Sequence, residues 1–314
     1  MPTNFPNGLA SYGIPLIGSG SQLPITNGNY YYVSSVTGSS GNTGTTISSP
    51  KATLQQAINL CTAANNDVVV LLPGHAETVT ATSVALNKST VQIIALGTGS
   101  TRATFTFDTA AATITVSATN VSIVNCRFVA NFANVASAFT LTTAVSCKIR
   151  DNEFVDTSSI LNFLCCVTTG ATDNSADGLE FTGNYVYSLP ATDGAVVSIH
   201  SNTLRLNVSN NIVDKAATND AGHLITLSSK IVGGVRIIGN ILTVVGSSGA
   251  AVGVMFTGSG TTSSGICAYN LVSSLDTTGA LIATAGTGIS FLENYMTGAV
   301  DKSGVIYPAT DNPA

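Results

Sequence analysis

The residues best suited to acid–base chemistry are a few carboxylates and three histidines, His75, His200 and His223. His75 stands two residues before Glu77, and such a pair could exchange a proton. The other two histidines lie in Val- and Thr-rich runs, where packed or surface positions are expected. Hydrolysis of a glycosidic bond would need two carboxylates that face one groove about 5 to 9.5 Å apart. Whether two acids meet that condition depends on the elements that carry them.

The six cysteines have neither metal-site nor redox spacing. No C-x-x-C motif occurs, and Cys165 and Cys166 are adjacent within the apolar run Phe163–Val167. We therefore expect buried, reduced thiols that behave as small hydrophobic side chains. The sequence predicts no metal site and no cofactor.

An internal repeat indicates which secondary-structure elements carry these residues. Its form is apolar-x-apolar-x-x-Asn-x-apolar, and the Asn slot falls at residues 126, 152, 184, 211, 240, 270 and 294, a period of about 28 residues. Alternation in the first three positions predicts a strand with one face inward. A second Val/Thr/Ser-rich run separates the copies, so each coil carries at least two strands. The sequence predicts an all-β fold, a right-handed parallel β-helix of about eight or nine coils.

One asparagine recurs in this repeat while its neighbours vary. We expect it to lie where the chain bends, because Asn tolerates the left-handed conformation of a sharp corner. Identical side chains in stacked coils can also hydrogen-bond to one another. The predicted structural ladder consists of Asn152, Asn184, Asn211, Asn240, Asn270 and Asn294, and Cys126 takes the slot in the first copy.

The repeat also places the acids. In the slot after the asparagine, Glu153 follows Arg127 of the preceding coil, and in an earlier slot Glu180 follows Lys148. Because stacked strands lie about 4.8 Å apart, this pattern predicts exposed ion pairs worth about 0.2 to 1 kcal/mol each. It does not predict a pair of catalytic acids, and we assign no catalytic residue.

One helix is predicted, at the front of the β-helix. Ser49 is the expected N-cap and Pro50 the first helical residue. An amphipathic helix here would cover the core and the strand edge of the first coil. Its apolar face consists of Leu54, Ala57, Ile58 and Cys61.

The chain therefore divides into four predicted parts. Residues 1–48 form an N-terminal arm that becomes ordered against a partner, and residues 49–66 form the capping helix. Residues 67–300 form the β-helix, and residues 301–314 form a tail. The arm residues expected to contact the partner are Asn4, Phe5, Pro6, Asn7, Gly8, Tyr12, Tyr30, Tyr31 and Tyr32.

Composition limits the classes of partner. Eleven basic and 16 acidic residues give a net charge of -5, too few cations for a dense nucleic-acid patch. The run Val68–Leu72 is far shorter than the roughly 18 apolar residues of a membrane span. The start, Met1–Gly8, has no signal-peptide pattern, so synthesis in a cytosol is expected. Weakly charged outer faces predict association of copies, through a face that the sequence does not identify.

Two parts of the chain resemble known families. Ser49–Ile58 and Asp67–Glu77, with the turn Leu72-Pro73-Gly74, resemble the capping helix and first strand of pectin-lyase-like right-handed β-helices. The opening Asn4–Gly8, with Gly13–Pro15 and the Leu-Pro-Gly-His-Ala-Glu segment, is similar to a group of tailed-bacteriophage virion proteins. That resemblance covers most of the chain. It implies a β-helix trimer that decorates a capsid or, in related forms, serves as a tailspike.

The enzymes of the pectin-lyase-like superfamily have patterns that this sequence does not show. The Asp pair with Gly-His-Gly and Arg-Ile-Lys is missing, and Gly222-His223-Leu224 is the nearest fragment. A cluster of calcium-binding acids with a catalytic Arg is not visible. The chain has no Trp and 6% aromatic residues, whereas sugars generally stack on aromatic faces. The position of His75 within the resemblance implies a structural role at the capped end.

The sequence and the resemblance together favour a non-enzymatic structural protein of the virion. We expect a homotrimer on the capsid exterior that binds the major capsid protein through residues 1–48 and bridges capsomers. It would be made in the bacterial host cytoplasm, without nucleic-acid or membrane partners. The alternative is a tailspike or receptor-binding protein that recognises host surface polysaccharide. A host-encoded polysaccharide enzyme or adhesin is a third, weaker hypothesis.

Overall fold

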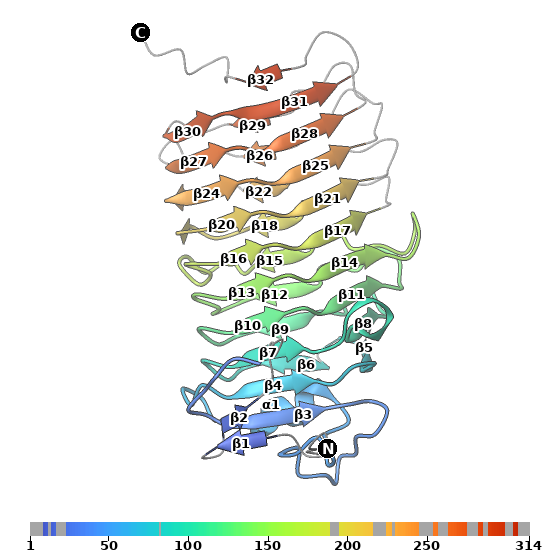
Figure 1. Cartoon of the computed structure of the whole chain (residues 1–314). Helices are drawn as coiled ribbons and strands as arrows, with labels where there is room; N and C mark the ends of the chain where they lie inside the picture. The colour runs from blue at the N-terminus through green and yellow to red at the C-terminus, as the bar shows by residue number, and fades with distance from the viewer. Residues whose placement is uncertain are drawn as a thin grey trace, which may run out of the picture.

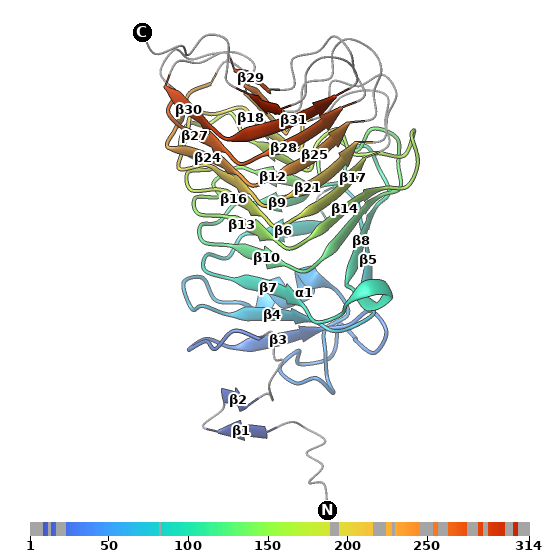
Figure 2. The ribbon, with the colours of Figure 1, turned by 45° about the horizontal axis from the view of Figure 1, so that its top comes forward.

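The computed structural model describes residues 9–11, 14–16, 23–81, 83–188, 195–215, 224–227, 230–244, 254–256, 263–274, 282–284, 288–298 and 304–306. The chain winds into a right-handed parallel β-helix whose rungs stack along one axis, from β3 at one end to β31 at the other (Figure 1). The predicted fold class is confirmed. Each rung contributes strands to up to three sheets, which surround the interior (Figure 2).

Sheet 1 contains ten parallel strands. They are β3 (Tyr30–Val33), β4 (Val68–Leu71), β7 (Gln92–Ala95), β10 (Ser122–Val124), β13 (Lys148–Arg150), β16 (Glu180–Thr182), β20 (Asn207–Ser209), β24 (Val235–Ile238), β27 (Gly265–Ala268) and β30 (Ile289–Leu292). The stack is thus longer than the predicted eight or nine coils. One extra rung, β3, comes from the segment that the sequence had assigned to the arm.

Sheet 2 follows sheet 1 around a sharp corner. Its parallel strands are β5 (Ala76–Val79), β8 (Thr104–Phe107), β11 (Arg127–Ala130), β14 (Glu153–Asp156), β17 (Tyr185–Ser188), β21 (Ile212–Lys215), β25 (Ile241–Val244), β28 (Leu271–Ser274) and β31 (Asn294–Gly298). An antiparallel strand, β32 (Gly304–Ile306), pairs with β31.

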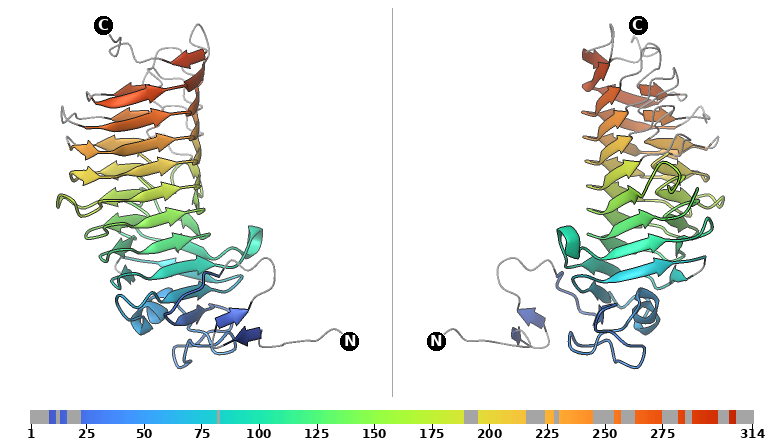
Figure 3. Two further views of the ribbon diagram at one scale, coloured as in Figure 1. Left: turned by 60° about the vertical axis from the view of Figure 1, so that its left-hand side comes forward. Right: turned by 90° about the vertical axis from the view of Figure 1, so that its right-hand side faces the viewer.

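Sheet 3 lies behind the other two (Figure 2). It contains β6 (Val84–Leu86), β9 (Ile114–Val116), β12 (Phe139–Leu141), β15 (Val167–Thr169), β18 (Val197–Ile199) and β22 (Ile225–Leu227), and the pair β26 (Val254–Phe256) and β29 (Ile282–Thr284) follows. The shorter elements are β1 (Leu9–Ser11), β2 (Ile14–Leu16), β19 (Thr203–Leu204), β23 (Val232–Gly233), α1 (Leu54–Leu60) and a 3-10 turn (Gly99–Thr101). The hairpin of β1 and β2 lies outside the stack of rungs (Figure 3).

The interior is filled by inward-facing side chains that repeat in register. Phe105, Phe128 and Phe154 are register partners in sheet 2, with ring centroids 5.7 and 5.1 Å apart. Phe181 of sheet 1 lies 5.6 Å from Phe154. Such aromatic contacts contribute about 0.5 to 1.5 kcal/mol each beyond their buried area. The alternation of apolar and polar residues along each strand therefore places one face in a continuous core.

The capping helix is shorter than predicted and begins later. Its N-cap is Thr53, whose side chain accepts a hydrogen bond from the Gln56 backbone N–H, so the predicted cap at Ser49 and first turn at Pro50 are wrong. The residues before Thr53 instead pair with the first rung, where the Lys51 N–H donates to the Tyr32 carbonyl. The predicted apolar face is confirmed, because Leu54, Ala57, Ile58 and Cys61 are all buried against the core.

The predicted arm does not extend to residue 48. Tyr30–Val33 form β3, which pairs in parallel with β4, because aromatic and β-branched residues suit a half-buried strand. The carboxylate of Asp67, fully buried, accepts from the backbone N–H groups of Asn29 and Thr62 and so joins this rung to the end of the helix. The folded body therefore includes residues upstream of the helix.

The left-handed corner between sheets 1 and 2 lies one residue earlier than predicted. Positive φ angles belong to the residue before each ladder position, including Asp151, Gly183, Asn210 and Gly239. A Cβ on Gly183 would lie 2.4 Å from a carboxylate oxygen of Asp151 in the preceding rung, so a larger residue there would make the Asp151 side chain move. The positive φ also favours glycine at this position. The ladder asparagine comes next, because its side chain must point inward to reach the neighbouring rungs.

The six predicted asparagines form a continuous buried ladder of hydrogen bonds. At Asn184, the amide nitrogen donates to the Ile149 carbonyl of the preceding rung at 2.9 Å and to the Asn211 side-chain oxygen at 3.2 Å. The backbone N–H of Asn184 also donates to that oxygen, at 2.9 Å. The same pattern recurs from Asn152 to Asn270, and Asn294 ends it by donating to the Cys267 carbonyl at 2.9 Å.

Replacement of Asn211 by alanine should destabilise the β-helix strongly. The change removes the acceptor of the Asn184 N–H and amide groups and the donor to the Phe181 carbonyl, which leaves buried polar groups unpaired at about 1 to 3 kcal/mol each. We expect a loss of about 3 kcal/mol or more in urea unfolding. The adjacent Asn210→Gly variant is the matched control, because its exposed, positive-φ position accepts glycine. Equal stability of the two variants would contradict the structural role of the ladder.

Candidate interaction surface

The residues predicted to contact a partner fall into two groups. Asn4, Phe5, Pro6, Asn7, Gly8 and Tyr12 lie outside the described residues. Tyr30, Tyr31 and Tyr32 belong to β3, within the folded body. The Tyr30 hydroxyl donates to the Pro24 carbonyl at 2.6 Å, and Tyr32 is buried in a small apolar cluster on the outer side of sheet 1. These three tyrosines thus anchor the first rung and are not part of a free arm.

A column of exposed apolar side chains runs up the outside of the β-helix at the start of the sheet 2 strands. Its members are register partners in five successive rungs and are 36% to 46% exposed. We call these residues the apolar column: Tyr185, Ile212, Ile241, Leu271 and Tyr295. At about 4.8 Å per strand, the column is about 19 Å long. Tyr269 and Leu292, at the same corner, are also exposed.

The same column is charged in the rungs nearer the N-terminal end. Glu153 forms ion pairs with Arg102 at 3.0 Å and with Arg127 at 3.7 Å. On the outer face of sheet 1, Lys148 pairs with Glu180 at 3.0 Å. The predicted pairing of Glu153 with Arg127 and of Glu180 with Lys148 is confirmed, whereas the sequence pattern missed Arg102. These carboxylates are neutralised by cations of neighbouring rungs and do not form an acid pair with each other.

His75 and Glu77 join three elements at the capped end. The His75 Nδ1 accepts from the Ser35 N–H at 3.0 Å, so Nε2 carries the proton and donates to the Glu77 carboxylate at 3.2 Å. That carboxylate also accepts from the Leu54 N–H, at the first turn of α1, at 2.8 Å. The His75 ring is buried edge-on against Phe105. The pair therefore fixes the helix to the first two rungs, as its place in the sequence implied.

His200 has hydrogen-bond partners of its own. His200 follows β18. Its ring Nε2 lies 2.9 Å from the Ser198 hydroxyl, and its backbone N–H donates to the Thr169 hydroxyl. His223 lies outside the described residues. The described part of the chain contains no group of three or more His, Cys, Asp or Glu residues that could hold a metal ion. In these described ranges, α1 has seven residues and no helix meets the length and hydrophobicity of a bilayer-spanning segment.

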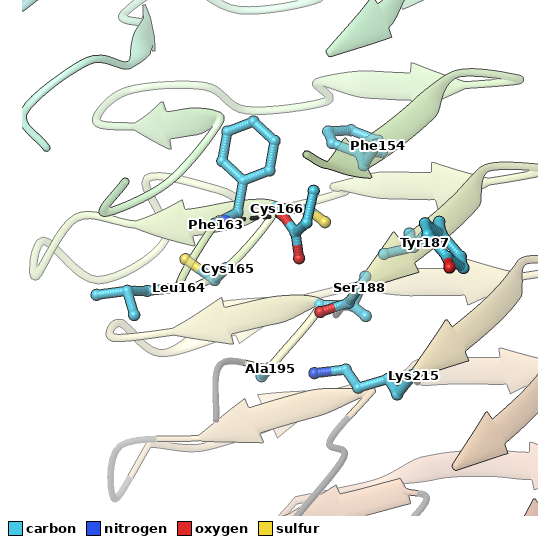
Figure 4. Close-up of a pocket in the computed structure, with 12 residues that line it drawn as sticks. Phe154, Phe163, Leu164, Cys165, Cys166, Tyr187, Ser188, Ala195 and Lys215 are labelled. Atoms are coloured by element: carbon cyan, nitrogen blue, oxygen red, sulfur yellow. Dashed lines mark hydrogen bonds between the residues drawn. The ribbon is translucent and has the colours of Figure 1, made fainter. Parts of the chain in front are cut away.

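A pocket between sheets 2 and 3 contains charges that sequence reasoning missed (Figure 4). Asp156 and Lys215, at the ends of their strands, are both 4% exposed, and the Asp156 carboxylate accepts from the Phe163 N–H at 2.9 Å. The alternation along each strand could have indicated them, because both occupy inward positions. The pocket encloses about 20 Å³, room for one water molecule and far less than a sugar ring needs.

The six cysteines are free, as the sequence predicted, and five are buried. Burial raises the pKa of the Cys126 and Cys147 thiols to about 12. At Cys165 burial raises the pKa to about 12 although the Lys215 ammonium opposes the change, and at Cys166 burial raises the pKa well above its usual value. Because the thiolate is the reactive form, these side chains are inert near neutral pH.

Comparisons with known proteins show the fold and not a family. No family model matches the chain, and no curated protein matches it by sequence. Among solved structures, a rhamnogalacturonan lyase is similar, with a TM-score of 0.54, 15% sequence identity, and coverage of 86% of this chain and 74% of the lyase. The chain therefore has a pectin-lyase-like parallel β-helix fold.

The buried thiols should make stability fall in alkaline solution. The folded pKa of Cys147, about 12, lies above the ordinary value of 9.0, so its contribution is complete below pH 9 and is lost as the pH rises towards 12. Urea unfolding from pH 8 to 11 measures the free energy of unfolding as a function of pH. Above pH 9 this free energy should fall more steeply for the native chain than for Cys147→Ala, by up to about 1.4 kcal/mol per pH unit. Parallel slopes would contradict the burial of this thiol.

Proposed function

We propose that this chain is a structural protein of a tailed-bacteriophage virion, a homotrimer that decorates the outer shell and bridges capsomers. The proposal joins a rigid β-helix to two interaction regions, one between copies and one towards the shell. The resemblance of Asn4–Gly8, Gly13–Pro15 and Leu72–Glu77 to virion β-helix proteins supports it. The major capsid protein is the proposed partner, and the capsid exterior is the proposed location.

The apolar column is the observation that carries this proposal. A contiguous exposed apolar patch on a soluble monomer usually marks an interface, and five register partners in successive rungs make such a patch here. Copies packed side by side around an axis parallel to the β-helix would bury column against column. Closed rotational symmetry would then bury every column and leave no apolar face free for further growth.

A side-by-side arrangement also gives the N-terminal regions a common direction. Residues 23–33 are fixed to the first rungs, by the Tyr30–Pro24 hydrogen bond and the pairing of β3 with β4. Residues 1–22 precede this anchor, and in parallel copies they would all start from the same end of the assembly. We therefore assign shell attachment to residues 1–22, a shorter segment than the 48 residues first expected.

A second function is favoured by one observation, the likeness to a rhamnogalacturonan lyase. A tailspike or receptor-binding protein on the same fold would recognise a surface polysaccharide, with or without cleavage. Tyr185 and Tyr295 of the apolar column are exposed aromatic rings on which a sugar could stack. Glycan binding that requires these tyrosines, in a chain that stays monomeric, would favour this alternative.

A charge placed in the apolar column should dissociate the assembly. We expect sedimentation velocity to show a trimer for the native chain and a folded monomer of 31.8 kDa for Ile241→Lys. In a trimer of this variant, the lysine ammonium groups would be buried in the apolar interface without an opposite charge, which is costly. Ile231→Lys is the matched control, since Ile231 is similarly exposed, 36% against 42%, but lies outside the column. A monomeric native chain, or a trimer in Ile241→Lys, would contradict the assignment.

Removal of the segment before the anchor should separate assembly from attachment. Deletion of residues 2–22 leaves Leu23, the anchor and β3 in place, so we expect an unchanged trimer that no longer co-sediments with capsids lacking the protein. The measurement compares full-length and shortened chains added back to such capsids. Undiminished attachment of the shortened chain would show that the shell contacts lie on the folded body.

A further inference from the structure

We propose that a groove on the outer face of sheet 1, near the N-terminal end of the β-helix, binds an acidic segment of a partner polypeptide. The choice of a polypeptide rests on the proposed virion function, while the groove and its charge stand on the geometry alone. The groove has a volume of about 560 Å³, within the range of ligand sites and far larger than the pocket between sheets 2 and 3.

The groove has a fixed wall and a strand floor. Its wall is the segment Pro24–Asn27, which is held by the Tyr30 hydroxyl on the Pro24 carbonyl at 2.6 Å and by the Asn66 amide on the Asn27 side chain at 3.0 Å. The floor is formed by outward side chains of β7, β10 and β13, three neighbouring strands of sheet 1 (Figure 1). A wall held by these bonds provides a pre-organised site, which lowers the ordering cost of binding.

Two polar atoms on the floor have no hydrogen-bond partner in the described part of the chain. The Ser122 side chain is 9% exposed, and its hydroxyl makes no hydrogen bond within the described residues. The Nε of Arg150 is likewise buried without an acceptor among them. Both atoms are covered by neighbouring protein atoms, so a ligand in the groove would meet the half-buried side chains of Lys148 and Arg150 and not these two atoms. Both residues line the groove.

The floor favours a ligand with negative charge. Lys148 and Arg150 both line the groove, in a chain whose net charge is -5. Glu180 neutralises Lys148 in part, at 3.0 Å, and leaves the guanidinium of Arg150 as the main cation. An Arg–carboxylate contact is charge-assisted and geometrically specific. With the amide of Gln92 beside them, these groups present mainly donors, which suit the carboxylates of Glu or Asp side chains.

The lining distinguishes a polypeptide from a glycan. The apolar part of the groove consists of aliphatic side chains, among them Ile25 and Val68, and none of the lining residues is aromatic. A sugar ring would therefore have no stacking surface. An extended peptide could instead place its own apolar side chains against Ile25, which is 81% exposed. The wall of the groove begins at Pro24, two residues after the segment 1–22 that is proposed to meet the shell.

Binding of a short acidic peptide to the full-length chain tests the inference. The probe is a fluorescein-labelled peptide of four Gly-Glu repeats, with the Gly-Gln peptide as its neutral match and tetragalacturonate as the glycan competitor. Fluorescence polarisation at 50 mM salt should show the Glu peptide bound at least about tenfold more tightly than the Gln peptide. It should be bound more tightly than tetragalacturonate, and Arg150→Gln should weaken it about tenfold or more.

Two further variants separate the groove from general charge and from folding. Ser122→Ala should leave both the peptide affinity and the melting temperature unchanged, because this hydroxyl is covered and has no hydrogen-bond partner within the described residues. Lys230→Gln, which removes a cation paired with Asp173 away from the groove, should leave binding unchanged. Equal affinity for the two peptides, insensitivity to Arg150→Gln, or tighter binding of tetragalacturonate would overturn the inference. None of these results depends on whether the chain resides in a virion.

Discussion

The corner between sheets 1 and 2 depends on one constraint, the full hydrogen bonding of a polar side chain inside an apolar core. A carboxamide offers two donors and an acceptor with two lone pairs, and the Asn ladder uses all of them between adjacent rungs. A buried asparagine that lost one of these hydrogen bonds would make the fold less stable than an apolar residue at the same position. The ladder therefore fixes the height and the register of each rung against the next.

Register, once fixed, determines what the outer surface can do. Because every rung repeats the same slots, residues a rung apart in sequence become neighbours about 4.8 Å apart, and the surface is composed of columns. One column changes from ion pairs around Glu153 to apolar side chains from Tyr185 onward. The charged part lies near the groove at the N-terminal end and the apolar part near the C-terminal end. A single rod thus offers two distinct surfaces, the groove proposed for a partner and the apolar column proposed for its own copies.

The sequence was sufficient for the fold because the repeat encodes it directly. The Asn slot, the apolar alternation and the pairing of Glu153 with Arg127 all follow from one period. The first rung could not be predicted in this way, since Tyr30–Val33 lie outside the repeat and are joined to it by tertiary pairing with β4. The corner was misplaced by one residue because Asn, Asp and Gly share the left-handed slot. The apolar column shares the slot of Glu153 and so follows from the same period, but its exposure is a property of the folded surface. The groove could not be predicted because its wall, Pro24–Asn27, lies outside the repeat.

The central proposal, that this chain coats a phage shell, is tested most directly by its copy number in purified virions that contain it. Quantitative mass spectrometry against the major capsid protein gives that ratio. A decoration protein should approach a fixed stoichiometry with the shell, on the order of hundreds of copies set by icosahedral symmetry. A few to a few tens of copies would contradict the account and assign the chain to the tail, where glycan recognition becomes the leading function.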